Sequence, residues 1–115
     1  MTTDAVQLSE AARGLLKALA SDTRQQILLL FAGGGELTVN EVAERLSLAQ
    51  SATSTHLATL REGGVLTSRR EWKTVYYRAD PERINRALLD LQSLLHACCP
   101  PQDAPAPGCS PSTCG

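Results

Sequence analysis

Two short helical patterns, separated by only three residues, occupy residues 38–62. The first opens on Thr38-Val39-Asn40-Glu41, a hydroxyl cap with a Glu three residues later, which predicts a helix start with a capping box. A tight link at Ser47-Leu48-Ala49 follows. The second pattern runs from about Gln50 to Glu62, where Gly63-Gly64 ends it. Two helices joined in this way predict a helix-turn-helix.

After residue 64 the helical period gives way to β-branched and aromatic residues. Residues 65–70 and 74–78 predict the two strands of a hairpin, with Glu71-Trp72-Lys73 as a charged tip. A basic hairpin directly after a helix-turn-helix is typical of a wing. We expect its cations to contact the DNA backbone or to enter the minor groove. The pattern therefore predicts a mainly α protein with a small β-hairpin, a winged helix-turn-helix.

Three further helical patterns flank this unit. One spans 6–20, and a second continues from the Ser21-Asp22 cap until Gly33-Gly34-Gly35. The last begins at Asp80-Pro81-Glu82, a favourable helix start, and runs through Ala97 with a leucine-rich stripe. Such a stripe is either plain core or a surface that buries against its own copy in a dimer. The 115 residues suit one small domain, over 1–99, with a Pro- and Cys-rich tail over 100–115 that we expect to be disordered alone.

Charge is distributed unevenly along the chain. Residues 1–44 carry three basic and six acidic groups, residues 45–86 eight and four, and residues 87–115 none and two. A positive middle between negative ends is expected if the centre meets a polyanion, although a solvated surface gives the same pattern. Only four aromatic residues are present, which argues against a single-strand binder that stacks bases. The candidate contacts to double-stranded DNA are Gln50, Ser51, Ser54, Thr55, His56, Arg61, Arg69, Arg70 and Lys73.

All four cysteines, Cys98, Cys99, Cys109 and Cys114, lie in the last eighteen residues. A secreted disulfide scaffold distributes its cysteines through the core, and this chain does the opposite. No apolar run approaches the roughly 18 residues of a membrane span, and no charged-then-apolar leader opens the chain. We therefore expect a cytoplasmic protein, without a membrane partner, whose thiols stay reduced and bind something soft.

Three segments together resemble the ArsR/SmtB family of metal-responsive winged-helix repressors. They are LKALASDTR at 16–24 followed by Ile27, TSTHLATLREGGVL at 53–66, and YYR at 76–78. The resemblance covers roughly residues 8–97. It implies a homodimer built from the first and last helices, an operator with two-fold symmetry, and release of the DNA when an inducer binds.

The predicted sensing site differs from two known patterns of that family. Many arsenic-responsive members carry a Cys-x-Cys before the recognition helix, where this chain has no thiol in residues 37–42. Zinc-sensing members use Asp and His ligands along the last helix, where this chain offers only Asp90 and His96. The remaining resemblance is to the branch whose arsenite site uses an adjacent cysteine pair, here Cys98-Cys99, with a third cysteine nearby.

Trivalent arsenic and antimony are soft and prefer three thiolates in a pyramid. Thiolates also select copper(I), zinc and cadmium. Tetrahedral zinc prefers a C-x2-C knuckle, which is absent here, since nine and four residues separate the later cysteines. The predicted ligands are Cys98, Cys99 and Cys109, with Cys114 as the alternative third ligand. Methylated trivalent arsenicals need only two thiols, and no constitutive cofactor is expected.

Catalysis is not predicted. No Lys or Arg follows Arg86 to assist a cysteine nucleophile, and no Cys-x-x-Cys accompanies a βαβ pattern. Three rivals keep the winged-helix fold: a thiol redox or persulfide switch, a sensor of cadmium, lead or zinc, and an interaction module with a zinc-stapled tail.

Overall fold

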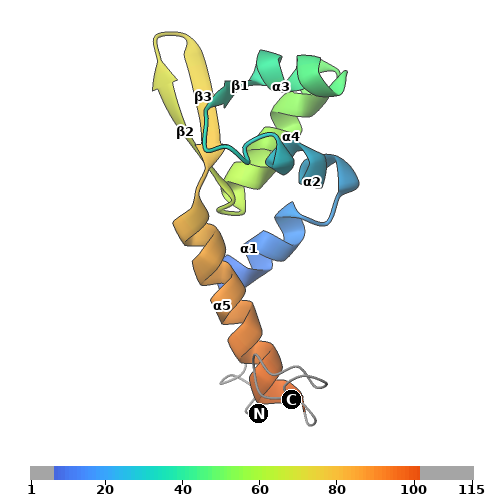
Figure 1. Ribbon diagram of the computed structural model, residues 1–115, viewed down its shortest axis with the longest axis vertical. Helices are drawn as coiled ribbons and strands as arrows, with labels where there is room; N and C mark the ends of the chain where they lie inside the picture. Colours follow the sequence, from blue (N-terminus) through green and yellow to red (C-terminus); the bar gives the residue numbers. More distant parts are fainter. Residues whose placement is uncertain (1–6, 102–115) are drawn as a thin grey trace, which may run out of the picture.

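The computed structural model describes residues 7–101 as five helices and a three-stranded sheet (Figure 1). In chain order the elements are α1 (Glu10–Ala18), α2 (Asp22–Leu29), β1 (Leu37–Thr38), α3 (Val39–Leu46), α4 (Gln50–Glu62), β2 (Leu66–Glu71), β3 (Thr74–Ala79) and α5 (Pro81–Cys98). The predicted fold class, mainly helical with a winged helix-turn-helix, is confirmed. The predicted tail over 100–115 lies outside the described residues except for Pro100 and Pro101.

The helix-turn-helix forms as the sequence predicts. The Thr38 hydroxyl accepts a hydrogen bond from the Glu41 amide at 3.2 Å, and the Glu41 carboxylate accepts one from the Thr38 amide at 2.8 Å, which completes the capping box. Ser47 then adopts a left-handed conformation with φ 55°, and the Leu48 amide donates to the Ala43 carbonyl at 2.9 Å. This turn ends α3 within one residue and allows α4 to begin at Gln50.

The wing is part of a three-stranded antiparallel sheet in the order β1-β3-β2. In the hairpin, Leu66 pairs with Ala79 and Glu71 with Thr74, which leaves Trp72 and Lys73 as the turn. The prediction of a three-residue tip was therefore wrong for Glu71, which extends β2. The strand β1 was not predicted, because its two residues are too few to show a periodic pattern. It pairs with β3 at Tyr76 and Tyr77.

The end of α2 also differs from the prediction. The helix stops at Leu29 rather than continuing to Gly33, because the amides of Leu30 and Phe31 donate to carbonyls three residues back, at 3.0 and 2.9 Å. These tight turns still bury Phe31, which is 2% exposed. The first helix starts later than predicted, at Glu10, because the Ser9 hydroxyl accepts a hydrogen bond from the Ala12 amide and caps it.

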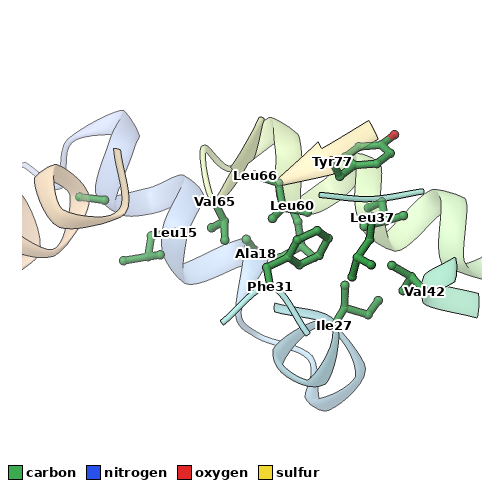
Figure 2. Packing of buried hydrophobic residues seen from close by; sticks show 12 residues of the cluster. Leu15, Ala18, Ile27, Phe31, Leu37, Val42, Leu60, Val65, Leu66 and Tyr77 are labelled. Atoms are coloured by element: carbon green, nitrogen blue, oxygen red, sulfur yellow. The ribbon is translucent and has the colours of Figure 1, made fainter. Parts of the chain in front are cut away.

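One apolar core joins the helix-turn-helix to the sheet (Figure 2). Its largest fully buried apolar side chains come from α2, α3, α4 and the start of the wing: Ile27, Val42, Leu57, Leu60, Val65 and Leu66. Burying each such side chain contributes about 1.5–3 kcal/mol to stability, so this cluster fixes α4 against the sheet. The outer face of α4 is consequently held rigidly relative to the wing.

The last helix extends away from this core. Asp80 caps α5 by accepting a hydrogen bond from the Arg83 amide at 3.2 Å, and α5 packs against α1, where the Ser9 hydroxyl donates to Asp90 at 2.8 Å. Only Ala87 of α5 is buried, whereas Leu88, Leu89 and Leu95 are each about half exposed. A single chain therefore leaves much of the predicted leucine stripe uncovered. No helix between residues 7 and 101 is long and apolar enough to cross a membrane.

Candidate nucleic-acid interface and thiol site

The outward face of α4 presents small hydrogen-bonding groups. Gln50, Ser51, Ser54 and Thr55 are exposed, and His56 is partly exposed. No acidic residue lies in the first turn, and Ala49 supplies no side-chain cap to that turn. Anionic or carbonyl acceptors can therefore approach these donors without repulsion. All five residues were predicted from the sequence as DNA contacts, and the structure places them on one helix.

His56 is held by a residue that the sequence analysis did not single out as functional. Arg24 on α2 donates from Nε to the Ala18 carbonyl at 2.8 Å and from Nη2 to the Lys17 carbonyl at 3.1 Å, and its Nη1 lies 3.4 Å from His56 Nδ1. A guanidinium can only donate, so a hydrogen bond across this contact requires Nδ1 of His56 to be the acceptor. Arg24 thereby links the end of α1 to the face of α4. Arg24 and His56 are 32 positions apart, so no periodic pattern could reveal the contact.

The wing brings further predicted cations towards α4. Arg61, near the end of α4, lines one hollow together with Arg69 and Arg70 of β2. Lys73 lines a second hollow with Gln50, the first residue of α4. Residues of the wing and of α4 thus line the same two hollows.

Arg69 differs from the other cations of this surface because its guanidinium already forms ion pairs with two carboxylates. Its Nε and Nη2 donate to Glu36 at 2.8 and 2.9 Å, and its Nη1 donates to Glu71 at 3.0 Å. The guanidinium also lies 4.6 Å from the ring centre of Tyr76. The hydrogen bond from Arg69 lowers the pKa of Glu36, and the hydrogen bonds to Glu36 and Glu71 raise the pKa of Arg69. In the part of the chain that the structure describes, Arg61, Arg70 and Lys73 form no ion pair.

Two thiols lie at the far end of α5, away from the wing (Figure 1). Cys98 is the last residue of the helix and Cys99 caps it, with their Sγ atoms 2.7 Å apart. Both side chains are exposed. The hydrogen bond between the thiols raises the pKa of Cys99, because deprotonating Cys99 next to Cys98 loses a shared proton. Two adjacent sulfurs of this kind can bind one soft ion together once they are deprotonated.

Cys109 and Cys114 lie outside the described residues. Asp90 is bonded to Ser9, and among residues 7–101 no three His, Cys, Asp or Glu side chains are grouped to hold a metal ion.

The sequence and the fold both match known proteins. Residues 21–68 match the sequence pattern of the family described as "Bacterial regulatory protein, arsR family". The chain is 42% identical over 82 residues to the transcriptional activator HlyU of Vibrio cholerae, a match that covers 71% of this chain and 74% of HlyU. The chain belongs to the ArsR family. The description of that family, a bacterial regulatory protein, agrees with the regulator that the sequence predicts.

This ArsR-family protein is also 50% identical over 68 residues to the arsenic resistance transcriptional regulator ArsR1 of Pseudomonas putida. That match covers 59% of this chain and 53% of ArsR1, so the chain spans about half the length of that relative. The fold resembles the solved structure of reduced HlyU from Vibrio cholerae with a TM-score of 0.56 at 40% identity, covering 77% of this chain and 88% of that one.

Proposed function

We propose that this ArsR-family regulator is a repressor that binds operator DNA as a homodimer and releases it when trivalent arsenic or antimony binds the thiolates of Cys98, Cys99 and Cys109. Cys114 is the alternative third ligand. The observation that carries the proposal is the exposed Cys98–Cys99 pair, with sulfur atoms 2.7 Å apart at the end of α5. Its similarity to an arsenic resistance regulator supports the choice of inducer.

The chemistry of arsenic favours this donor set. A three-coordinate ion with a lone pair needs two sulfurs close together and a third that approaches from one side. Cys98 and Cys99 supply the first two from one helix end, and a cysteine of the segment after Pro101 supplies the third. A methylated trivalent arsenical needs only the pair, so it is an inducer of the same site.

The dimer is proposed to form through α1 and α5. Half-exposed leucines on both helices supply apolar surface for a second copy: Leu16 on α1 and Leu88, Leu89 and Leu95 on α5. A two-fold dimer presents two copies of α4 to successive major-groove faces, about 34 Å apart. The proposed DNA contacts are Gln50, Ser51, Ser54, Thr55, His56 and Arg61 of α4 with Arg69, Arg70 and Lys73 of the wing.

Packed helices connect the thiols to the DNA-binding face. α5 packs against α1, and α1 packs against the end of α4. Inducer binding that shifts α5 at the dimer interface therefore changes the separation of the two α4 helices. Coupling energies of this kind are typically about 1–3 kcal/mol, and they are reciprocal, so bound DNA weakens inducer binding by the same factor.

Release of an operator duplex by arsenite, followed by fluorescence anisotropy, tests the proposal. The Cys98→Ser and Cys99→Ser variants should bind DNA as tightly as the wild type and should no longer respond to arsenite. Cys109→Ser and Cys114→Ser variants identify the third ligand, because only one of them should lose the response. Antimonite should act like arsenite, whereas cadmium, lead and zinc should act weakly. A full arsenite response of both the Cys98 and Cys99 variants would exclude this site.

A thiol redox switch is the second candidate, and the contact between the two Sγ atoms favours it. Oxidation by a thiol oxidant such as diamide would join the two sulfurs, with two electrons and two protons passing to the oxidant. The resemblance to a protein described in its reduced form fits this alternative. Release of DNA by diamide together with no release by arsenite would establish the redox switch in place of the metalloid sensor.

A further inference from the structure

The end of α2 and the turn after it carry five consecutive apolar residues. Ile27 and Phe31 are buried in the core, and Leu28 and Leu30 pack against it. Leu29 differs from these four, because 70% of its surface is exposed and it belongs neither to the core cluster nor to the residues packed against it. A single exposed leucine needs no explanation, so the surface around Leu29 decides whether it has a role.

Leu29 lines a hollow of about 820 Å³, within the size range of small-molecule sites in proteins. The walls come from three parts of the fold: α2 with the turn after it, the base of the β2–β3 hairpin, and the first turn of α5. Leu28, Phe31 and Ile84 add further apolar surface. The half-exposed leucines of the proposed dimer face do not line this hollow, so the two surfaces are separate.

Charges of both signs line the same hollow without neutralising one another. Arg78, Asp80 and Glu82 are among its lining residues. Among residues 7–101, both ion pairs belong to Arg69, so Arg78 pairs with neither carboxylate. Asp80 accepts a hydrogen bond through Oδ1 from the Arg83 amide, and Glu82 is exposed. An anionic ligand would meet two carboxylates and a cationic ligand would meet a guanidinium, whereas a zwitterion with an apolar body matches all three charges.

The spacing of these charges sets the length of the ligand. Arg78 lies near the end of β3 and Asp80 follows two residues later, so their side chains leave the extended chain on the same side, about 7 Å apart. Two residues of an extended peptide also span about 7 Å. The charged termini of a dipeptide therefore match this spacing, whereas a free amino acid carries both charges on one carbon atom and is too short.

We propose that this hollow binds a dipeptide with free termini and apolar side chains. The carboxylate of the ligand pairs with Arg78, and its ammonium group pairs with Asp80 and Glu82. Its side chains pack against Leu29 and the apolar surface beside it. The site is distant from the thiols at the far end of α5 (Figure 1), and the inference depends neither on DNA binding nor on the response to arsenic.

Isothermal titration calorimetry of the reduced full-length protein tests the proposal, with leucylleucine as the probe. N-acetylleucylleucine lacks the ammonium group and leucylleucinamide lacks the carboxylate. Each should bind about tenfold more weakly than leucylleucine, the loss expected for one charged hydrogen bond. Absence of leucylleucine binding, or equal affinity for the three peptides, would overturn the proposal.

L-leucine distinguishes a dipeptide site from a site for a free amino acid. It should bind more weakly than leucylleucine, because it cannot reach the charges at both ends of the hollow. Equal affinity for the two would overturn the assignment of the hollow to a dipeptide.

Substitution of Arg78 locates the site. Arg78→Gln should lower the affinity for leucylleucine by about tenfold and should bind leucylleucinamide as the wild type does, because the amide has no carboxylate to lose. Its thermal midpoint should not change, since Arg78 is exposed. Arg86→Gln is the matched control, because it removes another exposed arginine, on α5 outside the hollow. Undiminished leucylleucine binding by Arg78→Gln would overturn the proposal.

Leu29→Ala tests the apolar part of the hollow. It should weaken binding of all three peptides by the same factor, because each of them keeps the leucine side chains. A second copy of the chain is the other possible occupant. Dissociation of a dimer by Leu29→Ala, together with no binding of leucylleucine, would assign the hollow to that copy and overturn the proposal.

Discussion

Gly14 of α1 and Gly63 at the end of α4 are in backbone contact. A Cβ atom on Gly63 would lie 2.6 Å from the Gly14 carbonyl oxygen and 2.9 Å from the Cβ of Ala18. In the other direction, a Cβ on Gly14 would lie 3.1 Å from the Gly63 carbonyl oxygen. The helix proposed to dimerise and the helix proposed to read DNA therefore touch without side chains between them, so displacement of one is transmitted directly to the other.

Gly63→Ala should destabilise the protein by about 1–3 kcal/mol, because the new methyl group overlaps the backbone of α1. Gly63 has a φ of −80°, which alanine tolerates, so the effect is steric rather than conformational. Denaturant unfolding measures it. Gly35→Ala is the control, since nothing lies within 4 Å of a Cβ there, and its unfolding free energy should change by less than about 0.5 kcal/mol. Equal stability of the two variants would show that the contact is not tight in solution.

Arg24→Ala should weaken operator binding by about tenfold, because it removes the contact that orients His56. Fluorescence anisotropy measures the affinity. Gln25→Ala is the control, since Gln25 also donates to a carbonyl at the end of α1, that of Leu19 at 2.8 Å. Both variants should lose about 1 kcal/mol of stability, and only Arg24→Ala should lose affinity. Equal DNA affinities of the Arg24→Ala and Gln25→Ala variants would show that Arg24 only caps the end of α1.

Glu36→Gln should tighten DNA binding, because it releases part of the Arg69 guanidinium for a phosphate. The dependence of log K on log salt should become steeper by about 0.9, the value for one additional phosphate contact. Glu82→Gln on α5 removes the same charge from another exposed site and should leave the slope unchanged. An unchanged slope in Glu36→Gln would mean that Arg69 remains a structural residue of the wing when DNA binds.

Leu89→Glu should convert the proposed dimer to a monomer without unfolding it. The side chain is 53% exposed in a single chain, so the fold tolerates a carboxylate, whereas an apolar interface does not. The dimer dissociation constant should rise by about 100-fold or more, measured by analytical ultracentrifugation. Leu29→Glu, on α2, should remain dimeric. A dimeric Leu89→Glu variant would place the interface elsewhere.

Cys98→Ala should accelerate alkylation of Cys99 near neutral pH. The hydrogen bond between the two thiols raises the pKa of Cys99, so its removal lowers that pKa and increases the thiolate fraction at any pH below it. Mass spectrometry measures the rate at which iodoacetamide alkylates Cys99 between pH 7 and pH 10. Below the pKa, a decrease of one pKa unit should raise this rate by about tenfold. The difference between the two rates should shrink as the pH rises, because a growing share of Cys99 is then thiolate in both proteins. Leu95→Ala, one turn away, should alkylate like the wild type.

Sequence patterns located the helix-turn-helix closely because its boundaries depend on local chemistry. The Thr38–Glu41 capping box and the bounds of α4 need only residues that are near one another in sequence, and both are confirmed. β1 was missed because its pairing with Tyr76 and Tyr77 is a long-range property of the sheet. The early end of α2 was missed because Phe31 stays buried after the helix has stopped.

The candidate site was predictable in its residue types and not in its contacts. The face of α4 follows from helical spacing, whereas the pairing of Arg69 with Glu36 joins residues 33 positions apart. The contact of Arg24 with His56 depends in the same way on how α2 packs against α4. Charge counting identified Arg69 as a cation, and only the folded chain shows that two carboxylates neutralise it.

The exposed thiols at the end of α5 belong neither to the buried core cluster nor to the side chains packed against it. Mutations at the proposed thiol site can therefore change which soft ion it binds while the exposed face of α4 stays intact. The proposed sensing site and the proposed DNA-binding surface can thus diverge at different rates, because altering the few codons for the end of α5 changes one without the other.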